Sequence, residues 1–411
     1  MFHVEHTQNR FIMISHRQLF LQHVAQTSDA PLALEIASAK GMYIYDTDGK
    51  AYMDLIAGIS VSNLGHCHPD IVAAVQKQAG EYMHTLVYGE FVLAPQVQLA
   101  KLLADHLPAN LNSTYFVNSG TEAVEGALKL AKRYTNRQEI ISANKSYHGS
   151  TQGAMSLISE TYYNGPYRPL LPNVKHIEFN DFTHLERITE ATACVIIETV
   201  KAEIGVLCPR EGYLQALRKR CDEVGALLIL DEIQVGCGRT GTLFAFEQYG
   251  IVPDILLLAK GFGGGMPIGA FIASKEIMSV FMSNPVLGHI TTFGGHPVTC
   301  AAALANMQVL TMQKEIIDNV QRKADLFRSY LQHPAIKEIR NAGLLMAVEV
   351  LDFNFVLATI KACIEKGIIT DWFLFNNNSI RIAPPLIISD EEIKQACDIL
   401  LDIIDSIYKK R

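Results

Sequence analysis

The chain has 411 residues, of which 49% are hydrophobic and 19% are charged. This length and composition allow a large buried core, and they predict one large domain with a smaller companion. With 42 acidic and 35 basic residues, the formal net charge of −7 argues against a nucleic-acid partner and fits a cytoplasmic protein.

Two further features of the sequence bear on location. No run of residues is long and apolar enough to cross a bilayer, and the amino-terminal stretch, in which Met13 is an alternative start, lacks the apolar centre of a secretory signal. The eight cysteines form no C-x-x-C pair and lie scattered among apolar segments. This pattern predicts reduced, buried thiols and a cytoplasmic location, with no membrane partner.

The first predicted elements are a helix with a linker over residues 15–40 and then a β-hairpin. Residues 41–55 alternate around Asp48-Gly49, a pair typical of hairpin turns. A turn at residues 65–69 then leads into a helix over about residues 69–82. The turn contains His66, Cys67 and His68, which raises zinc as an alternative, but no second ligand pair has suitable spacing. A structural turn is therefore the preferred interpretation, with no metal.

The next unit joins a strand to a helix through a short polar turn. After a helix over residues 93–107, residues 115–117 form a short strand, and an amphipathic helix follows Ser119, Gly120 and Thr121. Backbone N–H groups, hydroxyls and the positive end of the helix dipole would suit a phosphate there. For this triplet alone, an N-cap with nothing bound is the simpler explanation.

Strand-like runs at residues 139–142 and 194–198 alternate with helical segments such as residues 213–224. This alternation predicts a mainly parallel sheet with both faces covered by helices. Two more apolar runs, 227–230 and 255–259, are too short for helices and end in Asp231 and Lys260. If these strands are parallel neighbours, a carboxylate and an amine emerge together at the edge where α/β sheets bind ligands.

The chemistry of that pair suggests an aldehyde cofactor. A lysine partly removed from water loses its proton more easily and can form a Schiff base with an aldehyde, and an aspartate suits a cationic ring nitrogen. A competing motif lies close by, because Gly236, Gly238 and Gly241 match the dinucleotide fingerprint G-x-G-x-x-G. That fingerprint should open a helix directly after the strand, and no helical start follows here.

The remainder of the chain predicts a separate small α+β unit. A long helix is expected from about Thr299 to Leu331, then a strand over 344–350, a helix over 355–366 and a strand over 379–382. Ser389 to Glu392 forms a capping box that opens the last helix, which carries apolar residues to Ile407.

Several motifs together resemble, in order, the signatures of class III pyridoxal-phosphate aminotransferases. They are Asn118-Ser119-Gly120-Thr121-Glu122-Ala123, Tyr147-His148-Gly149, Asp231-Glu232-Ile233-Gln234, Ala259-Lys260-Gly261, Thr291-Thr292-Phe293-Gly294-Gly295 and Arg381-Ile382-Ala383-Pro384-Pro385. The resemblance covers nearly the whole chain from about Met42 and is closest to the acetylornithine/ornithine aminotransferase branch.

The resemblance implies an α/β protein of fold type I and a homodimer with shared active sites. The large domain would hold a mainly parallel, seven-stranded-type sheet covered by helices, and a small α+β domain would form from the chain ends. The expected boundaries are 1–60 for an amino-terminal segment that joins the small domain, 61–300 for the large cofactor-binding domain and 301–411 for the carboxy-terminal small domain.

The resemblance also implies roles in binding pyridoxal 5'-phosphate. Lys260 would hold it as a Schiff base and then move a proton, while Asp231 would keep the ring nitrogen protonated. Tyr147 would stack on the ring and Gln234 would bond its phenolic oxygen. The remaining expected contacts are Ser119, Gly120 and Thr121 at the phosphate, Thr292 reaching the phosphate from the other subunit, and Glu198.

For the substrate, Arg381 suits bidentate binding of a carboxylate. Glu203 matches a family glutamate that pairs with this arginine and could cover it when a donor without that carboxylate enters. Three departures put a standard arginine-pathway substrate in doubt: Ser150 replaces an arginine, Ile59 replaces a tyrosine, and residues 198–205 differ, with Lys201 as a candidate replacement charge. An exposed loop lysine is the preferred interpretation of Lys201, and Tyr88, Glu90 and Phe91 are candidates to line the pocket.

The predicted function is therefore amino transfer between an amino acid or primary amine and a 2-oxo acid, with 2-oxoglutarate/glutamate as the expected partner, by a ping-pong mechanism. The alternatives are an aminomutase or racemase of the same fold, a dinucleotide-dependent dehydrogenase, and a protein that binds the cofactor without turnover.

Overall fold

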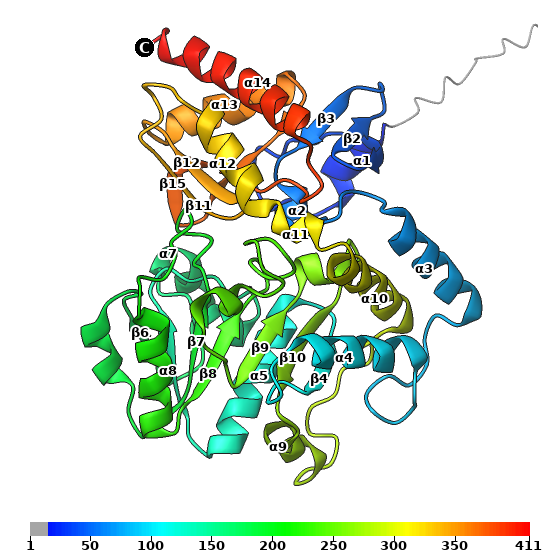
Figure 1. Ribbon diagram of the computed structural model, residues 1–411, viewed down its shortest axis with the longest axis vertical. Helices are drawn as coiled ribbons and strands as arrows, with labels where there is room; N and C mark the ends of the chain where they lie inside the picture. Colours follow the sequence, from blue (N-terminus) through cyan, green and yellow to red (C-terminus); the bar gives the residue numbers. More distant parts are fainter. Residues whose placement is uncertain (1–14) are drawn as a thin grey trace, which may run out of the picture.

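A seven-stranded sheet forms the centre of the larger part of the molecule, with strand order β4-β10-β9-β8-β7-β5-β6 (Figure 1). Its strands are β4 Ser113–Val117, β5 Glu139–Ala143, β6 Val174–Ile177, β7 Thr192–Glu198, β8 Leu227–Asp231, β9 Ile255–Leu258 and β10 Gly269–Ala273. All pairings are parallel except those that β10 makes with β4 and β9. The predicted α/β fold with a mainly parallel seven-stranded sheet is confirmed, and so is the parallel pairing of β8 with β9.

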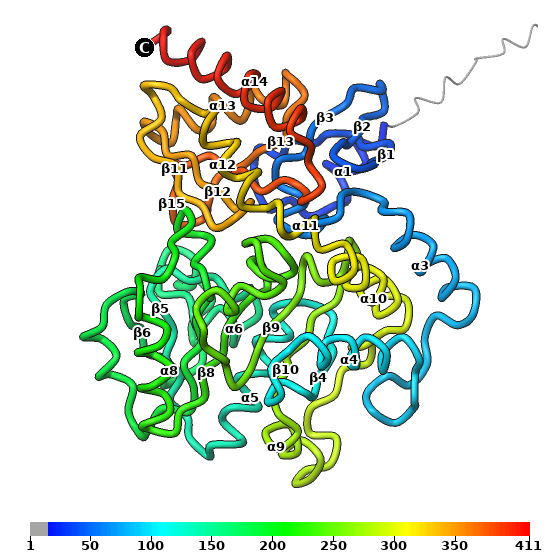
Figure 2. The backbone as a smooth tube through the Cα atoms, viewed as in Figure 1, coloured from blue at the N-terminus to red at the C-terminus, as the bar shows by residue number. Residues whose placement is uncertain are grey.

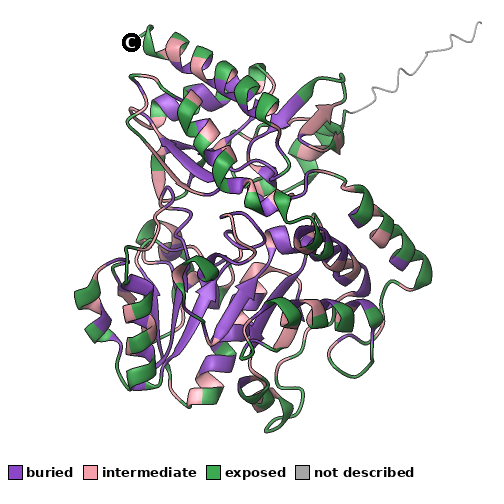
Figure 3. Ribbon diagram, in the orientation of Figure 1, coloured by how far each residue is buried: buried purple, intermediate pink, exposed green. Residues whose placement is uncertain are grey.

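Both faces of this sheet are buried, which explains the continuous apolar runs in its strands (Figure 3). Successive residues point to opposite faces, so Ile229 packs with the apolar face of α5 (Gly120–Thr135), and Leu228 and Leu230 pack with α8 (Tyr213–Val224). The sheet is therefore the middle layer of an α/β/α sandwich.

The close contact between α5 and the sheet depends on Gly126. A Cβ atom at this position would lie 2.3 Å from the buried ring of Phe271, which is stacked on Tyr115 and has no free space. We expect Gly126→Ala to lower the free energy of unfolding by about 1–3 kcal/mol, through overpacking. Gly80→Ala, in an exposed helical position with no atom near its Cβ, should instead raise it by about 0.5–1 kcal/mol. Chemical denaturation of both variants measures these changes in the free energy of unfolding. A Gly126→Ala variant as stable as Gly80→Ala would contradict the role of Gly126 in this contact.

The longer helices are α1 His16–His23, α3 Pro69–Glu81, α4 Ala94–His106, α5, α8, α10 Pro297–Met312, α12 Val320–Tyr330, α13 Phe353–Glu365 and α14 Asp390–Tyr408. Apart from α1, α10 and α12, they lie close to their predicted positions. The short helices are α2 Ala57–Ser60, α6 Gln152–Met155, α7 Thr161–Asn164, α9 Lys275–Met278 and α11 Glu315–Asp318, and the 3₁₀ turns are η1 Gly165–Tyr167, η2 Phe182–Arg187, η3 Ala245–Tyr249, η4 Lys260–Gly263 and η5 Ser279–Met282. This computed structural model describes residues 15–411, so Met13 and the rest of the amino-terminal stretch lie outside the described residues.

The single long helix predicted over residues 299–331 is wrong. It is three helices, because Gln313 leaves the helical conformation (φ −100°, ψ 68°) and α11 and α12 follow. The break lets α10 pack on α3 and α4 in the larger part, while α12 packs on α14. The helix predicted within residues 15–40 is also shorter than its segment, since α1 ends at His23 and residues 36–40 form β1.

The smaller part of the molecule combines both ends of the chain (Figure 2). One of its sheets contains β1 Ile36–Lys40, β2 Tyr43–Asp46, β3 Ala51–Asp54 and β13 Ile368–Ile369, and the other contains β11 Glu338–Ala342, β12 Leu345–Glu349, β14 Asp371–Phe373 and β15 Asn376–Ile382. The predicted hairpin is β2–β3, and β3 pairs in parallel with β13. This pairing joins the amino-terminal segment to the carboxy-terminal part, as expected for a boundary near residue 60. Because residue 300 lies inside α10, we propose to move the second boundary to the end of that helix and to assign α10 to the large domain.

None of the helices within residues 15–411 combines the length and the apolar character that crossing a bilayer requires.

Candidate active site

The carboxyl ends of β7, β8 and β9 meet at one edge of the central sheet. Glu198 and Asp231 are paired neighbours on β7 and β8, and Lys260 follows β9. These side chains line a cavity of about 530 Å³, which we call the inner cavity. Its walls include Val61, Asn118, Ser119, Gly120, Thr121, Tyr147, His148, Gly149, Ser150, Glu198, Val200, Asp231, Ile233, Gln234, Val235, Lys260 and residues 265–268. The site thus lies where an α/β sheet is expected to bind a ligand.

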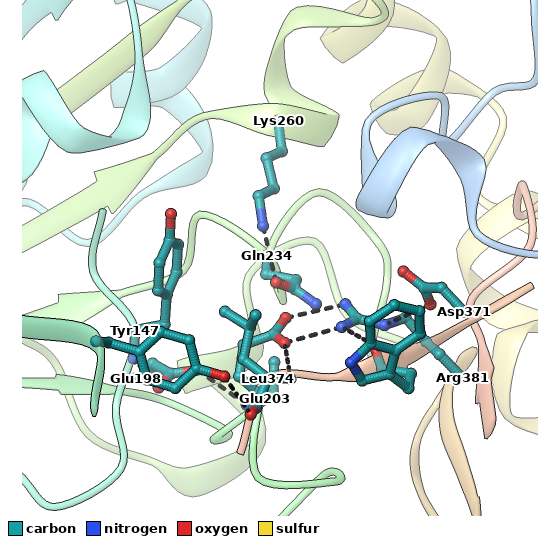
Figure 4. A network of polar contacts seen from close by, with 11 residues as sticks. Tyr147, Glu198, Glu203, Gln234, Lys260, Asp371, Leu374 and Arg381 are labelled. Atoms are coloured by element: carbon teal, nitrogen blue, oxygen red, sulfur yellow. Dashed lines mark hydrogen bonds and ion pairs between the residues drawn. The ribbon is translucent and has the colours of Figure 1, made fainter. Parts of the chain in front are cut away.

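Lys260 points into the inner cavity and donates a hydrogen bond from Nζ to Oε1 of Gln234 at 2.8 Å (Figure 4). Burial lowers the pKa of its ammonium group, and this lowering is opposed by the negative charge of Glu203. Its backbone has φ +47°, in the left-handed region that a side chain with a Cβ rarely adopts. A larger fraction of this side chain is therefore in the neutral, nucleophilic form than for an exposed lysine. The strained backbone conformation is typical of a functional position.

Asp231 is buried and is held by two contacts. Its Oδ2 lies 2.7 Å from Nδ1 of the buried His148, and its Oδ1 accepts from the backbone N–H of Ile233 at 3.0 Å. An imidazole N–H on Nδ1 would stabilise the ionised carboxylate. His148 belongs to the Tyr147-His148-Gly149 motif but was not predicted as a site residue, although the motif itself was the signal that could have identified it.

The amino terminus of α5 opens onto the same cavity. Ser119 caps the helix, its Oγ accepting from the N–H of Glu122 at 3.3 Å, and Oγ1 of Thr121 lies 2.6 Å from Oγ1 of Thr151. The first N–H groups of a helix have no partner within it and carry the positive end of the dipole. The backbone N–H groups at Gly120 and Thr121 are thus available as anion donors, together with the O–H of Ser119, whose oxygen only accepts, whereas the Thr121 hydroxyl already has a partner.

A glycine brings the backbone close to this terminus. A Cβ atom on Gly149, whose φ is +129°, would lie 2.4 Å from Oγ1 of Thr121. The preceding Tyr147 donates from its backbone N–H to Oε1 of Glu198 at 3.3 Å, and Oε2 of Glu198 accepts from the N–H of Ala202 at 2.9 Å. Burial raises the pKa of Glu198. Glu198 therefore positions the loop that carries the Tyr147 ring into the cavity.

Arg381 and Glu203 form a buried bidentate pair beside the inner cavity (Figure 4). Nη1 donates to Oε1 at 2.9 Å and Nη2 donates to Oε2 at 2.8 Å, although the two residues are far apart in the chain. The guanidinium also lies 4.4 Å from the centre of the Phe373 ring and 3.0 Å from a carboxylate oxygen of Asp371, whose pKa burial raises to about 6. Glu203 therefore occupies the face of Arg381 that would grip a substrate carboxylate.

The expectation for Lys201 is corrected by the structure. Its side chain is buried, with Nζ donating to the carbonyl of Asn144 and lying 5.8 Å from the centre of the Phe179 ring. Burial lowers the pKa of its ammonium group. It is not an exposed loop lysine, and it does not line the inner cavity.

Other predicted pocket residues do not line the inner cavity of their own subunit. Thr292 is exposed on the loop before α10, Ile59 lies in the kinked α2, and Tyr88, Glu90 and Phe91 lie outside the walls. Val200 and Ile233, which the sequence reasoning missed, are walls. The only feature of the sequence that could have identified them is their apolar character close to the ends of β7 and β8.

The two competing motifs have structural explanations. The segment with Gly236, Gly238 and Gly241 forms turns, and the next element is the short η3 rather than a helix after β8, so the dinucleotide fingerprint lacks its structural context. In the His66 turn, Nε2 of His66 lies 2.9 Å from a carboxylate oxygen of Asp54. Within residues 15–411, no group of three or more metal-ligating side chains is assembled.

The inner cavity fits pyridoxal 5'-phosphate. It offers a helix amino terminus for a phosphate, a buried carboxylate for a ring nitrogen and a partly buried amine for an aldehyde. Nε2 of Gln234 is buried with no hydrogen-bond partner among the described residues, so it remains a free donor for a ring oxygen. The volume is also that of a typical small-molecule site.

Comparison with known proteins agrees with this chemistry. The family model described as Aminotransferase class-III matches residues 24–404. The chain is 39% identical to an acetylornithine aminotransferase from Methanopyrus kandleri, covering 93% of this chain and 96% of that one, and 41% identical to a putrescine aminotransferase from Pectobacterium atrosepticum, covering 87% and 80%. Among solved structures, the ornithine aminotransferase from Toxoplasma gondii superposes with a TM-score of 0.88 at 30% identity, covering 97% of each chain.

Proposed function

Because the chain belongs to the class-III aminotransferase family, whose members use pyridoxal 5'-phosphate, we propose that it transfers amino groups between glutamate/2-oxoglutarate and a primary amine or amino acid. It is a pyridoxal-phosphate-dependent transaminase; the glutamate partner and the residue roles are the proposal. The observation that carries it is the shared cavity of Lys260 and Asp231, with a helix amino terminus in its wall.

The proposed cofactor contacts follow from the cavity walls. The N–H groups of Gly120 and Thr121, with Ser119, would hold the phosphate, and Gln234 would donate to the phenolic oxygen. Tyr147 would pack on the ring, with its loop fixed by Glu198.

The chemistry then divides between the cofactor and three side chains. When bound, the cofactor supplies an electron sink for the pair of electrons released at the substrate's α-carbon. Asp231 would hold a proton on the cofactor's ring nitrogen. Lys260, whose pKa is lowered by burial, would remove the proton from the donor's α-carbon and, in the second half of the reaction, would deliver a proton to the α-carbon of the incoming 2-oxo acid. Arg381 orients a donor or acceptor that carries a carboxylate.

A homodimer is part of the proposal. Thr292 and Phe293 are exposed next to the apolar side chains of Val286, Leu287 and Ile290, a surface that suits a second copy of the chain and would bring Thr292 to the partner's phosphate site. Sedimentation should then give twice the chain mass of 45.5 kDa. We also propose a cytoplasmic location, supported by eight free cysteines.

The proposal is tested with purified holoenzyme and glutamate. Glutamate should convert the yellow cofactor to its amine form and release 2-oxoglutarate in equal amount, and a second 2-oxo acid should restore the colour. Turnover of an amine with no dependence on any 2-oxo acid would instead support an aminomutase or racemase, and a colour that no amine alters would overturn the proposal.

Glu203 should act as the cover of Arg381. In Glu203→Ala, glutamate still finds Arg381 for a carboxylate, but an amine without a carboxylate leaves the buried guanidinium without this partner. We expect the ratio of glutamate to amine conversion rates to rise about 10- to 100-fold, because a hydrogen-bonded charge contact of this kind contributes about 1.5–3 kcal/mol. Single-turnover rates measure the ratio. The control is Glu190→Ala, at an exposed glutamate; an unchanged ratio in Glu203→Ala would show that there is no such cover.

A further inference from the structure

A second cavity adjoins the inner one and is not explained by the cofactor. It also has a volume of about 530 Å³, and we call it the outer cavity. The two cavities share Tyr147 and Ser150, whose hydroxyl oxygens lie 3.0 Å apart. The remaining walls of the outer cavity are Thr27, Gln152, Met155, Ile158, Tyr163, Tyr167, Leu374 and Phe375. A substrate that reaches Lys260 in the inner cavity can therefore extend into the outer one past the side chain of Ser150.

The walls of the outer cavity are neutral and largely apolar. No lining residue is charged, and four of them are aromatic. Three of its hydroxyl groups are engaged, since that of Tyr147 meets Ser150 and that of Tyr163 donates to the carbonyl of Leu374 at 2.9 Å. A carboxylate or ammonium group placed there would lose part of its hydration without gaining an ionic partner. An uncharged apolar group would lose no hydrogen bonds to water and would bury apolar surface on the rings of Tyr163 and Phe375. These two rings pack edge to face with their centres 5.4 Å apart.

The floor of the outer cavity is bonded to the glutamate that covers Arg381 (Figure 4). The N–H of Leu374 donates to Oε2 of Glu203 at 3.1 Å, and the N–H of Phe375 donates to the carbonyl of Glu203 at 2.9 Å. Displacing the Glu203 side chain from Arg381 therefore breaks a contact with this floor. The closed Glu203–Arg381 pair and the formed outer cavity belong to the same arrangement of the protein.

We propose that the outer cavity binds the uncharged, apolar end of the amine donor, and that this donor is the one accepted while Glu203 still covers Arg381. This inference rests on the proposed function and narrows its second substrate to primary amines with a neutral apolar tail. The side chain of Ser150 is small and neutral, and its hydroxyl is paired with that of Tyr147, so it leaves a passage between the two cavities.

Three donors of one chain length distinguish the tail chemistries. Hexylamine, 6-aminohexanoate and 1,6-diaminohexane end in a methyl group, a carboxylate and an ammonium group, and each is mixed with holoenzyme in single-turnover experiments, with glutamate alongside. Hexylamine should convert the cofactor at least about tenfold faster than either of the other two. An equal or faster rate with the diamine would assign the aromatic walls to a cation instead, and an equal or faster rate with the amino acid would overturn the inference. If glutamate converts the cofactor but hexylamine is slower than the other two amines, the outer-cavity inference alone is rejected. If no donor converts the cofactor, the aminotransferase proposal is rejected.

Two substitutions place charges in the cavity walls. Met155→Glu should lower the hexylamine rate relative to the glutamate rate more than tenfold, whereas Met312→Glu, the same change on the exposed end of α10, should leave the ratio as it is. Ser150→Arg should raise the rate with 6-aminohexanoate relative to hexylamine at least about tenfold, by supplying a charge-assisted contact. Ratios that neither substitution changes would overturn the inference.

A readout without turnover uses 4-phenylbutan-1-ol, which has an apolar tail but no amine. Calorimetry should detect its binding to the holoenzyme and weaker binding to Met155→Glu. Because a filled outer cavity favours the closed Glu203–Arg381 pair, the alcohol should also slow conversion by glutamate. Binding that is equal in Met155→Glu and in Met312→Glu would place the alcohol elsewhere, and binding without any effect on glutamate would overturn the link to Glu203.

Discussion

Lys260→Ala is expected to lower amino transfer by at least about 10³-fold, because it removes both the nucleophile and the proton-transfer group of the inner cavity. No other lysine lines this cavity among the described residues. The neighbouring carboxyl groups already have hydrogen-bond partners, since Asp231 is paired with His148 and Glu203 with Arg381. No nearby side chain can therefore replace the amine.

The measurement has a covalent and a kinetic part. Borohydride reduction of the wild-type holoenzyme, followed by peptide mass spectrometry, should find the cofactor attached to Lys260, and the variant should show no attachment. Single-turnover rates with glutamate measure the kinetic loss. Lys361→Ala, at an exposed lysine of α13, is the matched control and should retain the wild-type rate. Attachment at another lysine, or a variant with wild-type turnover, would refute the role of Lys260.

Asp231→Asn is expected to lower the rate by about 10²- to 10³-fold, the usual effect of removing one preorganised electrostatic partner. The substitution preserves the shape of the side chain but removes the negative charge that faces the inner cavity. It also exchanges the carboxylate partner of His148 Nδ1 for a neutral amide in a buried position. We therefore expect weaker cofactor binding together with a slower reaction.

Single-turnover kinetics and equilibrium cofactor titration separate these two effects. Asp402→Asn, on the exposed face of α14, is the control for the same chemical change. A His148→Phe variant keeps the carboxylate and should lose less activity than Asp231→Asn. If Asp231→Asn retains the wild-type rate and cofactor affinity, Asp231 does not face the ring nitrogen.

Much of this architecture was predictable because its causes are local. The apolar runs that end in Asp231 and Lys260 indicated buried parallel strands, and parallel strands necessarily bring their carboxyl ends to one edge. The helix after Ser119 was predicted from its periodicity and its cap. The prediction of one long helix over residues 299–331 was wrong because its cause is not local. The sequence is helical on both sides of Gln313, and the break is required by packing against two different parts of the molecule.

The fold class and the pairing of an amine with a carboxylate follow from the order of the residues alone, since both depend on hydrophobic patterns and on the geometry of parallel strands. Tertiary structure decided which side chains meet across the loops: Glu203 with Arg381, His148 with Asp231, Lys201 with the carbonyl of Asn144, and Leu374 with Glu203. Such contacts join residues far apart in the chain through segments that have no repeating pattern. Their partners are set by the packing of the whole molecule, and the outer cavity beside Ser150 became visible only when that packing was known.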